Sequence, residues 1–266
     1  MKRTIGCIGC GNMGGALMGG FASSLAGEDF AFCGYSRTLA KVERLDGVTA
    51  LADATAVAKA ADIVLLAVKP YQMQDVLSAI SPQLTAGKVV VSVAAGIGLD
   101  KLRAWSGGQC AVVRCMPDTP ALVGKGVFAF AFGDMPQAGK DEIMRMFATL
   151  GLCLELPEAQ FAAFSALIGA GPAYVFAMMQ GLVQAGVTLG FGHDASRQMV
   201  AALFEGCAVM ARQSDAHLVQ LRDAVCSPAG LTIAGVNHLD RQGLAGTLVD
   251  AVLAAAKRGQ EMETGK

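Results

Sequence analysis

The chain has 266 residues, of which 53% are hydrophobic and 16% are charged, and its formal net charge is −1. This length allows one large domain or two smaller ones, each with an ample core. The small net charge gives no reason to expect a nucleic-acid or membrane-surface partner. The chain enters a strand pattern without a secretory signal, and its eight cysteines lie in apolar runs. Both features predict a cytoplasmic protein with reduced thiols.

The first half of the chain alternates strand and helix patterns. Helices are expected at 12–26 and 71–80, between apolar runs that few polar residues interrupt. Such runs are typical of a parallel sheet with both faces covered. The pattern predicts a doubly wound α/β domain of the Rossmann type. The predicted strands cover residues 4–9, 30–35, 62–68, 88–95 and 110–116.

The second half is expected to be helical. Two short strand candidates, 126–130 and 153–156, flank a predicted helix at 136–150. After Pro157 the pattern contains helices alone, so we expect an NAD(P)-binding domain at 1–157 and an all-α dimerisation and substrate domain at 158–266. The predicted helices cover residues 158–190, 194–214, 216–224, 229–242 and 244–262.

One long apolar run could be mistaken for a membrane span. No Asp, Glu, Lys, Arg or His occurs between Glu158 and His193, but Gly169, Gly171 and Pro172 interrupt the run early. A helix that is apolar on most sides is typical of the centre of an oligomer. The run therefore predicts a homodimer rather than a membrane protein.

A glycine-rich turn follows the first strand. Gly9, Gly11 and Gly14 form G-x-G-x-x-G between that strand and the first helix. In a β-α-β unit this pattern predicts a dinucleotide site, because it gives a tight turn, close backbone approach to a pyrophosphate and close helix–strand packing. We expect cofactor contacts along the whole turn, at Ile8, Gly9, Cys10, Gly11, Asn12 and Met13. Cys7 and Cys10 form one C-x-x-C pair without a second pair, so no metal is expected.

The end of the second strand indicates which dinucleotide binds. An acidic residue there would bind the ribose hydroxyl of NAD, but the chain has Ser36, Arg37 and Thr38 instead. Two hydroxyls and a guanidinium suit a 2′-phosphate, so NADP(H) is favoured over NAD(H). The alternative is that these residues are only solvated loop residues.

Two further strand ends are expected at the same crevice, because ligands of open α/β sheets lie at the carboxyl ends of the strands. The first is the segment Ala67, Val68, Lys69 and Pro70, in which Lys69 could equally be a surface lysine. The second contains Ala94 and Ala95, whose small side chains allow a flat ring to lie close.

The segment "VCSPAGLTIAG" (225–235) allows two interpretations. Ser227 could cap a helix whose first position is Pro228. The same turn could form one wall of an active site, because free N–H groups at a helix start bind anions. Considered alone, the segment favours the cap.

Together these segments carry a resemblance. "IGCGNMGGAL", "AVKP", "VSVAAG", "RCMPDTPALVGKG", "GAGPAYVF" and "LRDAVCSPAGLTIAG" occur in the order and spacing of the Δ1-pyrroline-5-carboxylate reductase family. The resemblance covers the chain from end to end. It implies an NAD(P)H-dependent imine reductase that makes L-proline, a Rossmann domain followed by helices that interlock in a dimer, and further assembly into rings of dimers.

The chain departs from the family pattern at five positions. The resemblance places Asp118 where the family usually has Asn, Ile168 and Ala170 where it has Ser, Ala229 where it has Gly, and Leu231 where a small apolar residue is tolerated. A carboxylate at Asp118 would repel a substrate carboxylate unless it is paired or points away. A modified substrate or a lower activity would follow from such repulsion.

The implied reaction adds a hydride to the C=N carbon of a five-membered cyclic imine. An iminium is already electrophilic, and none of the three histidines lies in a matching motif. We expect catalysis mainly by positioning. The N–H groups of 230–232 would hold the substrate carboxylate, and the Thr232 hydroxyl would meet the ring nitrogen. The expected substrate-binding residues are Asp118, Ser227, Gly230, Leu231 and Thr232, with Thr232 catalytic.

Three other functions stay open at this stage. A β-hydroxyacid dehydrogenase would need a lysine on the helix after the domain boundary, and residues 158–190 contain none. A family member with altered catalysis could reduce another cyclic imine. A non-catalytic relative could bind NADP and regulate, since fold alone does not assign function.

Overall fold

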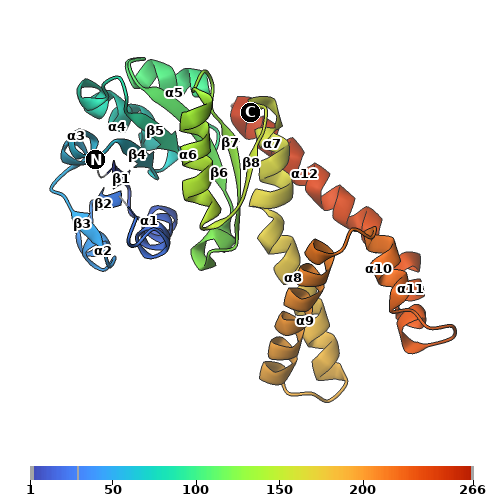
Figure 1. Cartoon of the computed structure of the whole chain (residues 1–266). Coiled ribbons are helices and arrows are strands. Elements are labelled where there is room, and N and C mark those ends of the chain that lie inside the picture. The colour runs from blue at the N-terminus through green and yellow to red at the C-terminus, as the bar shows by residue number, and fades with distance from the viewer. Residues whose placement is uncertain (1–2, 29, 265–266) are drawn as a thin grey trace. The chain divides into compact units, whose positions relative to one another are not determined.

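The computed structural model describes residues 3–28 and 30–264. The chain forms two compact units: Met1–Gly169 with Gly259–Lys266, called the sheet unit here, and Ala170–Arg258, called the helical unit (Figure 1). The sequence pattern places the domain boundary after residue 157. The sheet unit also retains residues 158–169.

The sheet unit is built on eight strands in the order β3-β2-β1-β4-β5-β6-β7-β8. Neighbouring strands are parallel except for β6 and β7, and in the centre Ile5 pairs with Phe32 on one side and with Ile63 on the other. The strand bounds are Arg3–Ile8 (β1), Phe30–Tyr35 (β2), Val48–Ala50 (β3), Ile63–Leu66 (β4), Val89–Ser92 (β5), Ala111–Pro117 (β6), Gly126–Ala131 (β7) and Gly151–Glu155 (β8).

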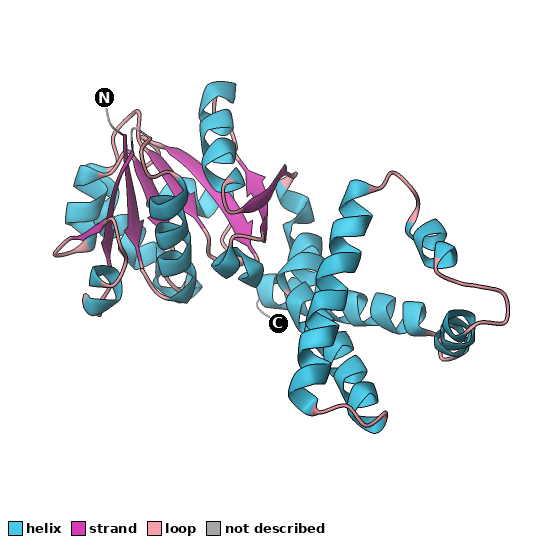
Figure 2. Cartoon of the chain, turned by 60° about the horizontal axis from the view of Figure 1, so that its bottom comes forward, coloured by secondary structure: helices cyan, strands magenta, loops and turns pink. Residues whose placement is uncertain are grey.

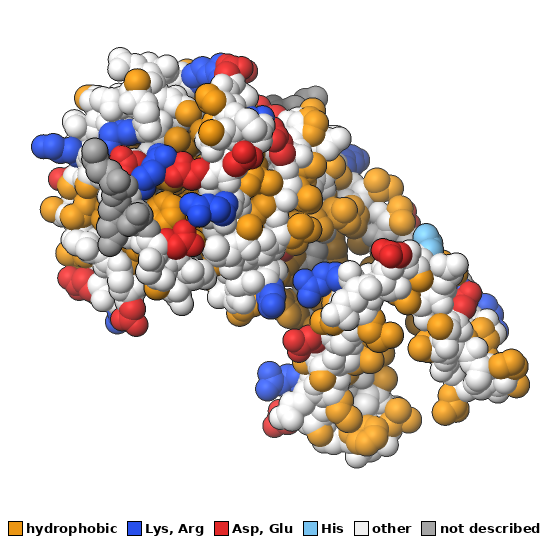
Figure 3. Space-filling model, viewed as in Figure 1, with side chains coloured by type: hydrophobic (Ala, Val, Ile, Leu, Met, Phe, Trp, Pro, Cys, Tyr) orange, Lys and Arg blue, Asp and Glu red, His pale blue; other side chains and the backbone are white. Residues whose placement is uncertain are grey.

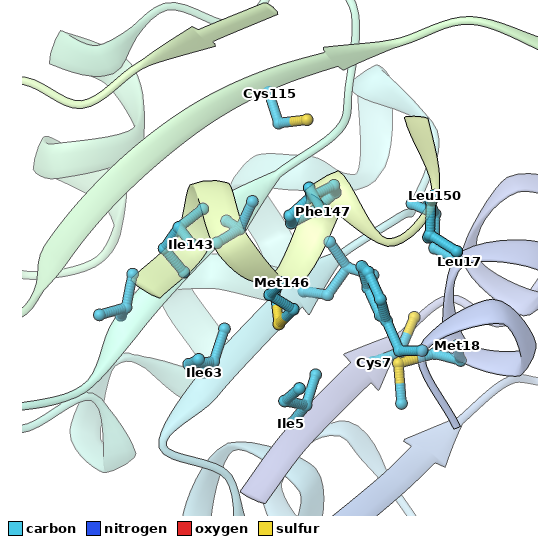
Figure 4. Close-up of a cluster of buried hydrophobic side chains, with 14 of the residues drawn as sticks. Ile5, Cys7, Leu17, Met18, Ile63, Cys115, Ile143, Met146, Phe147 and Leu150 are labelled. Carbon is cyan, nitrogen blue, oxygen red and sulfur yellow. The ribbon is translucent and has the colours of Figure 1, made fainter. Parts of the chain in front are cut away.

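Helices cover both faces of this sheet (Figure 2). On one face, Leu17 of α1 (Asn12–Ser24) and Phe147 of α6 (Gln137–Ala148) join Ile5 of β1 in a buried cluster (Figure 4). The α2 helix (Ala40–Glu43) contributes to the same cluster.

On the other face, a second cluster joins Ile8 of β1 to apolar side chains of three helices. These helices are α3 (Ala54–Ala60), α4 (Met73–Ile80) and α5 (Leu99–Trp105). Because successive side chains of a strand point to opposite faces, residues 5 and 8 serve different clusters, and the central strands are apolar on both sides. The predicted Rossmann-type domain is confirmed.

The segment after β8 is not the single helix that the sequence pattern predicts for 158–190. It consists of a 3₁₀ turn (Glu158–Gln160), α7 (Phe161–Phe164), a π-helical turn (Ser165–Gly169) and α8 (Gly171–Thr188). Pro172 lacks an N–H and is tolerated at the first turn of a helix, so α8 begins anew there. Glu158–Thr188 is long and apolar enough to cross a membrane. The core helix of a soluble protein meets the same criteria of length and composition, so this is weak evidence for a membrane span.

The helical unit contains α8, α9 (His193–Gln213), α10 (Leu218–Ala224), α11 (Leu231–Arg241) and α12 (Leu244–Thr264), whose last residues belong to the sheet unit. α8 and α9 pack on each other around the buried Val183 and Val200. Many apolar side chains of this unit are exposed on the single chain, and Figure 3 shows them on α8 and α9. They include Phe176, Leu182, Met199, Leu203, Met210 and Leu253.

The start of α11 corrects one prediction. The helix begins at Leu231 rather than at 229, and its N-cap is Gly230, with no side-chain hydrogen bond, rather than Ser227. The reason is a tight turn before the helix, in which Gly230 N–H donates to the Ser227 carbonyl (3.0 Å) and Ala229 has φ +57°. Left-handed backbone at Ala229 cannot continue into a helix, so Pro228 lies in the turn.

Candidate active site

The turn between β1 and α1 has a geometry that requires glycine at two positions. Gly9 donates its N–H to the Tyr35 carbonyl at the end of β2 (2.9 Å) and has φ +98°. A Cβ on Gly9 would lie 2.8 Å from the Ala67 carbonyl, and one on Gly14 would lie 2.5 Å from the Gly9 carbonyl oxygen. The packing of the protein itself therefore excludes larger residues at both positions.

Gly11 differs from these two glycines. A Cβ added there would have a single neighbour within 4 Å, the Gly9 carbonyl oxygen at 4.0 Å, so the space beside Gly11 is open. Gly11 is also the N-cap of α1 and makes no side-chain cap. The first N–H groups of a helix have no intrahelical partner and attract anions. The open space and the uncapped helix start together fit the pyrophosphate of a dinucleotide.

A hollow of about 550 Å³ adjoins this turn. Cys10, Gly11 and Asn12 line one end of it, and Lys41 and Arg44 line it from α2 and its C-terminus. The side-chain cations of Lys41 and Arg44 make no hydrogen bond or ion pair within the described part of the chain. Sequence reasoning missed both residues. The sequence could have indicated Lys41, because a helix that begins soon after Thr38 places Lys41 within its first turn, close to the end of β2.

The residues after β2 lie at the same edge of the sheet as the glycine turn. Ser36 is half-buried, whereas Arg37 and Thr38 are exposed. The Arg37 guanidinium makes no hydrogen bond or ion pair with any described residue, so its donors are available to a ligand. Five N–H donors in a planar fork suit a phosphate group.

The ends of β4 and β5 complete the carboxyl edge. The Ala67 N–H donates to the Ile8 carbonyl (2.9 Å), which holds the end of β4 against the glycine turn, and Val68 is half-buried. Lys69 is exposed, and Pro70 begins a 3₁₀ turn. After β5, Ala94 is buried and Ala95 is exposed. The residues from 8–13, 36–37, 67–70 and 94–95 thus lie at one edge of the sheet, in the strand ends and the segments that follow them.

Two thiols lie under the glycine turn. The Cys10 thiol donates to the Cys7 carbonyl oxygen across 3.8 Å, and both side chains are buried. The neighbouring Cys10 thiol and burial raise the pKa of Cys7, and the neighbouring Cys7 thiol lowers the pKa of Cys10. Within the described residues, no group of three or more His, Cys, Asp or Glu side chains is placed to hold a metal.

Asp118 follows β6, and its carboxylate faces into the protein. It is 6% exposed, and its Oδ1 accepts the Val127 N–H of β7 at 2.9 Å. Burial raises the pKa of the Asp118 carboxyl, although the bond from Val127 opposes this rise. This carboxylate is therefore partnered within the sheet unit.

The turn 227–232 brings four of the predicted residues together in the helical unit. Ser227, Leu231 and Thr232 are exposed, Gly230 is half-buried, and a Cβ on Gly230 would lie 2.1 Å from the Ser227 Oγ. A larger residue at 230 would require the Ser227 side chain to rotate away, and its Cβ would also lie 3.1 Å from the Ser227 carbonyl oxygen. The turn leaves the start of α11 without a side-chain cap, so the N–H groups of its first residues are available to an anion.

Two of the five departures lie in the segment before α8. Ile168 is half-buried and packs on the apolar cluster of Phe161, Phe164 and Ala129. An apolar side chain at this position contributes to the core of the sheet unit. Ala170 is half-buried and is the N-cap of α8.

The doubly wound sheet and its glycine turn define a dinucleotide-binding protein of the Rossmann class. Residues 4–96 match the family described as NADP oxidoreductase, coenzyme F420-dependent, and residues 158–262 match the family described as pyrroline-5-carboxylate reductase dimerisation. The chain belongs to the pyrroline-5-carboxylate reductase family.

Individual relatives give the same assignment. The pyrroline-5-carboxylate reductase of Glycine max is 39% identical over 217 residues, which cover 81% of this chain and 79% of that protein. The one from Escherichia coli (strain K12) is 32% identical over 98% of this chain and 99% of its own length. The crystal structure of Plasmodium falciparum pyrroline carboxylate reductase with NADP bound is 30% identical, covers 99% of each chain and superposes with a TM-score of 0.85.

Proposed function

We propose that this protein reduces the cyclic imine 1-pyrroline-5-carboxylate to L-proline with NADPH. The observation that carries the proposal is the match to reductases of this name over nearly the whole chain, including both the dinucleotide-binding and the helical parts. The glycine turn, the uncapped start of α1 and the free Arg37 guanidinium support the cofactor half of the proposal.

NADPH is proposed over NADH because of the residues that follow β2. Ser36 and Arg37 follow β2 where an NAD-specific protein carries an acidic residue, and Arg37 is exposed with no partner in the described part of the chain. Lys41, whose ammonium is also unpaired, lines the hollow nearby. These cations would bind the 2′-phosphate. The backbone of 8–13 would hold the pyrophosphate, and the loops at 67–70 and 94–95 would hold the nicotinamide half.

Bound NADPH supplies the hydride. The proposed role of the chain is to bind the imine, hold its carboxylate on the N–H groups of 230–232 and on Ser227, and bring the Thr232 hydroxyl to the ring nitrogen. Leu231 would line the same wall. Asp118 is proposed to border the substrate from the end of β6, with its Oδ1 accepting the Val127 N–H.

The helical unit is proposed to form a homodimer. Large apolar side chains such as Phe176 (65% exposed) and Leu253 (61% exposed) face solvent on the single chain, and exposed apolar surface of this extent marks an interaction site. Rings of dimers, a cytoplasmic location and the absence of nucleic-acid or membrane partners are part of the same proposal.

The test is an assay of NADPH oxidation with 1-pyrroline-5-carboxylate beside a panel of other cyclic imines, with NADH as the alternative cofactor. We expect the highest kcat/KM with pyrroline-5-carboxylate and NADPH. A different preferred imine would show that the departures near the site change the substrate. NADPH binding without reduction of any imine would instead support a non-catalytic regulator.

A further inference from the structure

A partly buried ion pair joins β6 to the segment that follows β8. Arg114 on β6 is 7% exposed, and its Nη1 lies 3.0 Å from Oε1 of Glu158. The guanidinium carbon also lies 4.4 Å from the centre of the Phe161 ring. The ring of Phe161 thus holds the Arg114 guanidinium. Because the buried charge of Arg114 is costly unless it is paired, Arg114 in turn holds the Glu158 carboxylate, whose side chain is 34% exposed.

The same carboxylate oxygen has a second contact. Oε1 of Glu158 accepts the N–H of Leu99, the first residue of α5, at 2.9 Å. A Cβ on the preceding Gly98 would lie 3.2 Å from that oxygen, so the backbone passes close to it. One atom of Glu158 therefore joins β6 to the backbone where the β5–α5 loop ends.

This loop, residues 93–98, is anchored at both ends. At its start, Val93 N–H donates to the Leu66 carbonyl (3.0 Å), and Ala94 N–H donates to the buried Ser92 Oγ (3.3 Å). At its far end, Ile97 is buried in the apolar cluster of α3, α4 and α5, and Glu158 accepts the Leu99 N–H. Between them Ala95 and Gly96 are exposed, and Gly96 has φ +73°. The middle of the loop thus depends on its two ends for a fixed position.

The loop lies in the half of the sheet where the nicotinamide is expected. A doubly wound sheet consists of two mononucleotide-binding halves, and the residues suited to the adenosine 2′-phosphate follow β2. The nicotinamide half therefore lies at the carboxyl ends of β4 and β5. The small residues Ala94 and Ala95 allow the ring to lie against the backbone there.

We propose that Glu158, held by Arg114, is a positioning residue that fixes the β5–α5 loop for the nicotinamide end of the cofactor. This inference rests on the proposed function. Glu158 also begins the segment that leads from β8 towards the helical unit, so a single side chain ties that segment to the loop. Neither residue is proposed to touch the cofactor.

The test compares two ligands that share the adenosine end, NADPH and 2′,5′-ADP, by titration of the full chain. In Glu158→Ala we expect the Kd of NADPH to rise at least fivefold, while the Kd of 2′,5′-ADP stays within twofold of the wild-type value. Glu158→Gln keeps an oxygen that can accept the Leu99 N–H but removes the charge facing Arg114, so a smaller rise is expected. Single-turnover hydride transfer should slow in the same order.

Glu155→Gln is the matched control. Glu155 lies on β8 and pairs with Lys140 at 2.6 Å, with no contact to the loop, so both dissociation constants should stay unchanged. Gly98→Ala is the second variant if Glu158 variants do not fold. It keeps every charge but places a Cβ 3.2 Å from the Glu158 Oε1. We expect the Kd of NADPH to rise and the Kd of 2′,5′-ADP to stay unchanged.

Two results would overturn the proposal. Equal weakening of NADPH and 2′,5′-ADP would show general damage to the fold, and unchanged binding of both would show that the loop does not depend on Glu158. A wild-type protein that binds NADPH but reduces no imine would count against the proposed function only, because the two-ligand comparison needs no substrate.

Discussion

Arg37 is the residue on which the proposed cofactor preference depends. Its guanidinium, at the end of β2, has no partner among the residues that the structure describes. We expect Arg37→Asp to lower kcat/KM with NADPH by about 10- to 100-fold, because the loss of a charge-assisted hydrogen bond costs about 1.5–3 kcal/mol. The same variant should lose much less with NADH. Equal losses with both cofactors, in steady-state assays, would show that Arg37 does not contact the 2′-phosphate.

Asp118 makes the stability of the protein depend on pH. Burial raises the pKa of its carboxyl, so the folded protein binds this proton more tightly than the unfolded chain does. The free energy of unfolding therefore falls as pH rises from below the unfolded pKa of about 3.9 through the folded pKa, and stays lower above it.

Asp118→Asn should remove this pH dependence, because an amide does not titrate in this range. The amide oxygen can still accept the Val127 N–H, so the local structure should be kept. We expect a higher Tm than wild type at pH 7 and a difference that shrinks towards pH 4, measured by thermal unfolding across that range. A variant that is less stable at pH 7, or a gain that does not vary with pH, would refute this account.

At the scale of elements, a substitution in the turn before α11 distinguishes a structural role of Thr232 from a catalytic one. Thr232→Ala removes a hydroxyl and leaves the turn and the N–H groups in place. If the hydroxyl contacts the imine nitrogen, turnover of Thr232→Ala should fall by about ten- to a thousandfold, which is below or within the range for a positioned proton donor. Thr232→Ser should retain much of the wild-type turnover. NADPH binding should barely change. A lower Tm with wild-type single-turnover hydride transfer would mean that Thr232 only supports the helix start.

The sequence predicts some elements better than others, for physical reasons. The glycine turn and the central strands are local patterns, and the structure contains them where they were expected. β3 has three residues and was missed, because so short a run carries no periodicity. The start of α11 was placed two residues early, since the left-handed backbone at Ala229 leaves no signal in a non-glycine residue.

Contacts between distant residues could not be predicted from local patterns. Glu158 contacts residues 44 and 59 positions away, and its role emerged only from the structure. The position of the candidate cofactor residues at one edge was predictable, because the strand ends of one parallel sheet share that edge. Their individual roles, like those of the 227–232 turn, stay predictions that the variants above test.

At the scale of the whole molecule, we expect the protein to be stable only as a dimer or larger assembly. Phe176→Asp on α8 should abolish soluble assembly, because an unpaired charge in a buried interface is costly. Tyr71→Asp on the sheet unit, where Tyr71 is 79% exposed, is the control and should leave the assembly unchanged. Light scattering on dilute protein measures both. A folded wild-type monomer at micromolar concentration would contradict this expectation.

The central claim is that the chain transfers a hydride to the C=N carbon of pyrroline-5-carboxylate. The most direct measurement supplies NADPH carrying deuterium at the transferred position and analyses the product by mass spectrometry and NMR. We expect L-proline with one deuterium per molecule, bound to the carbon that was double-bonded to nitrogen. Unlabelled proline, or no proline while NADPH binds, would contradict it.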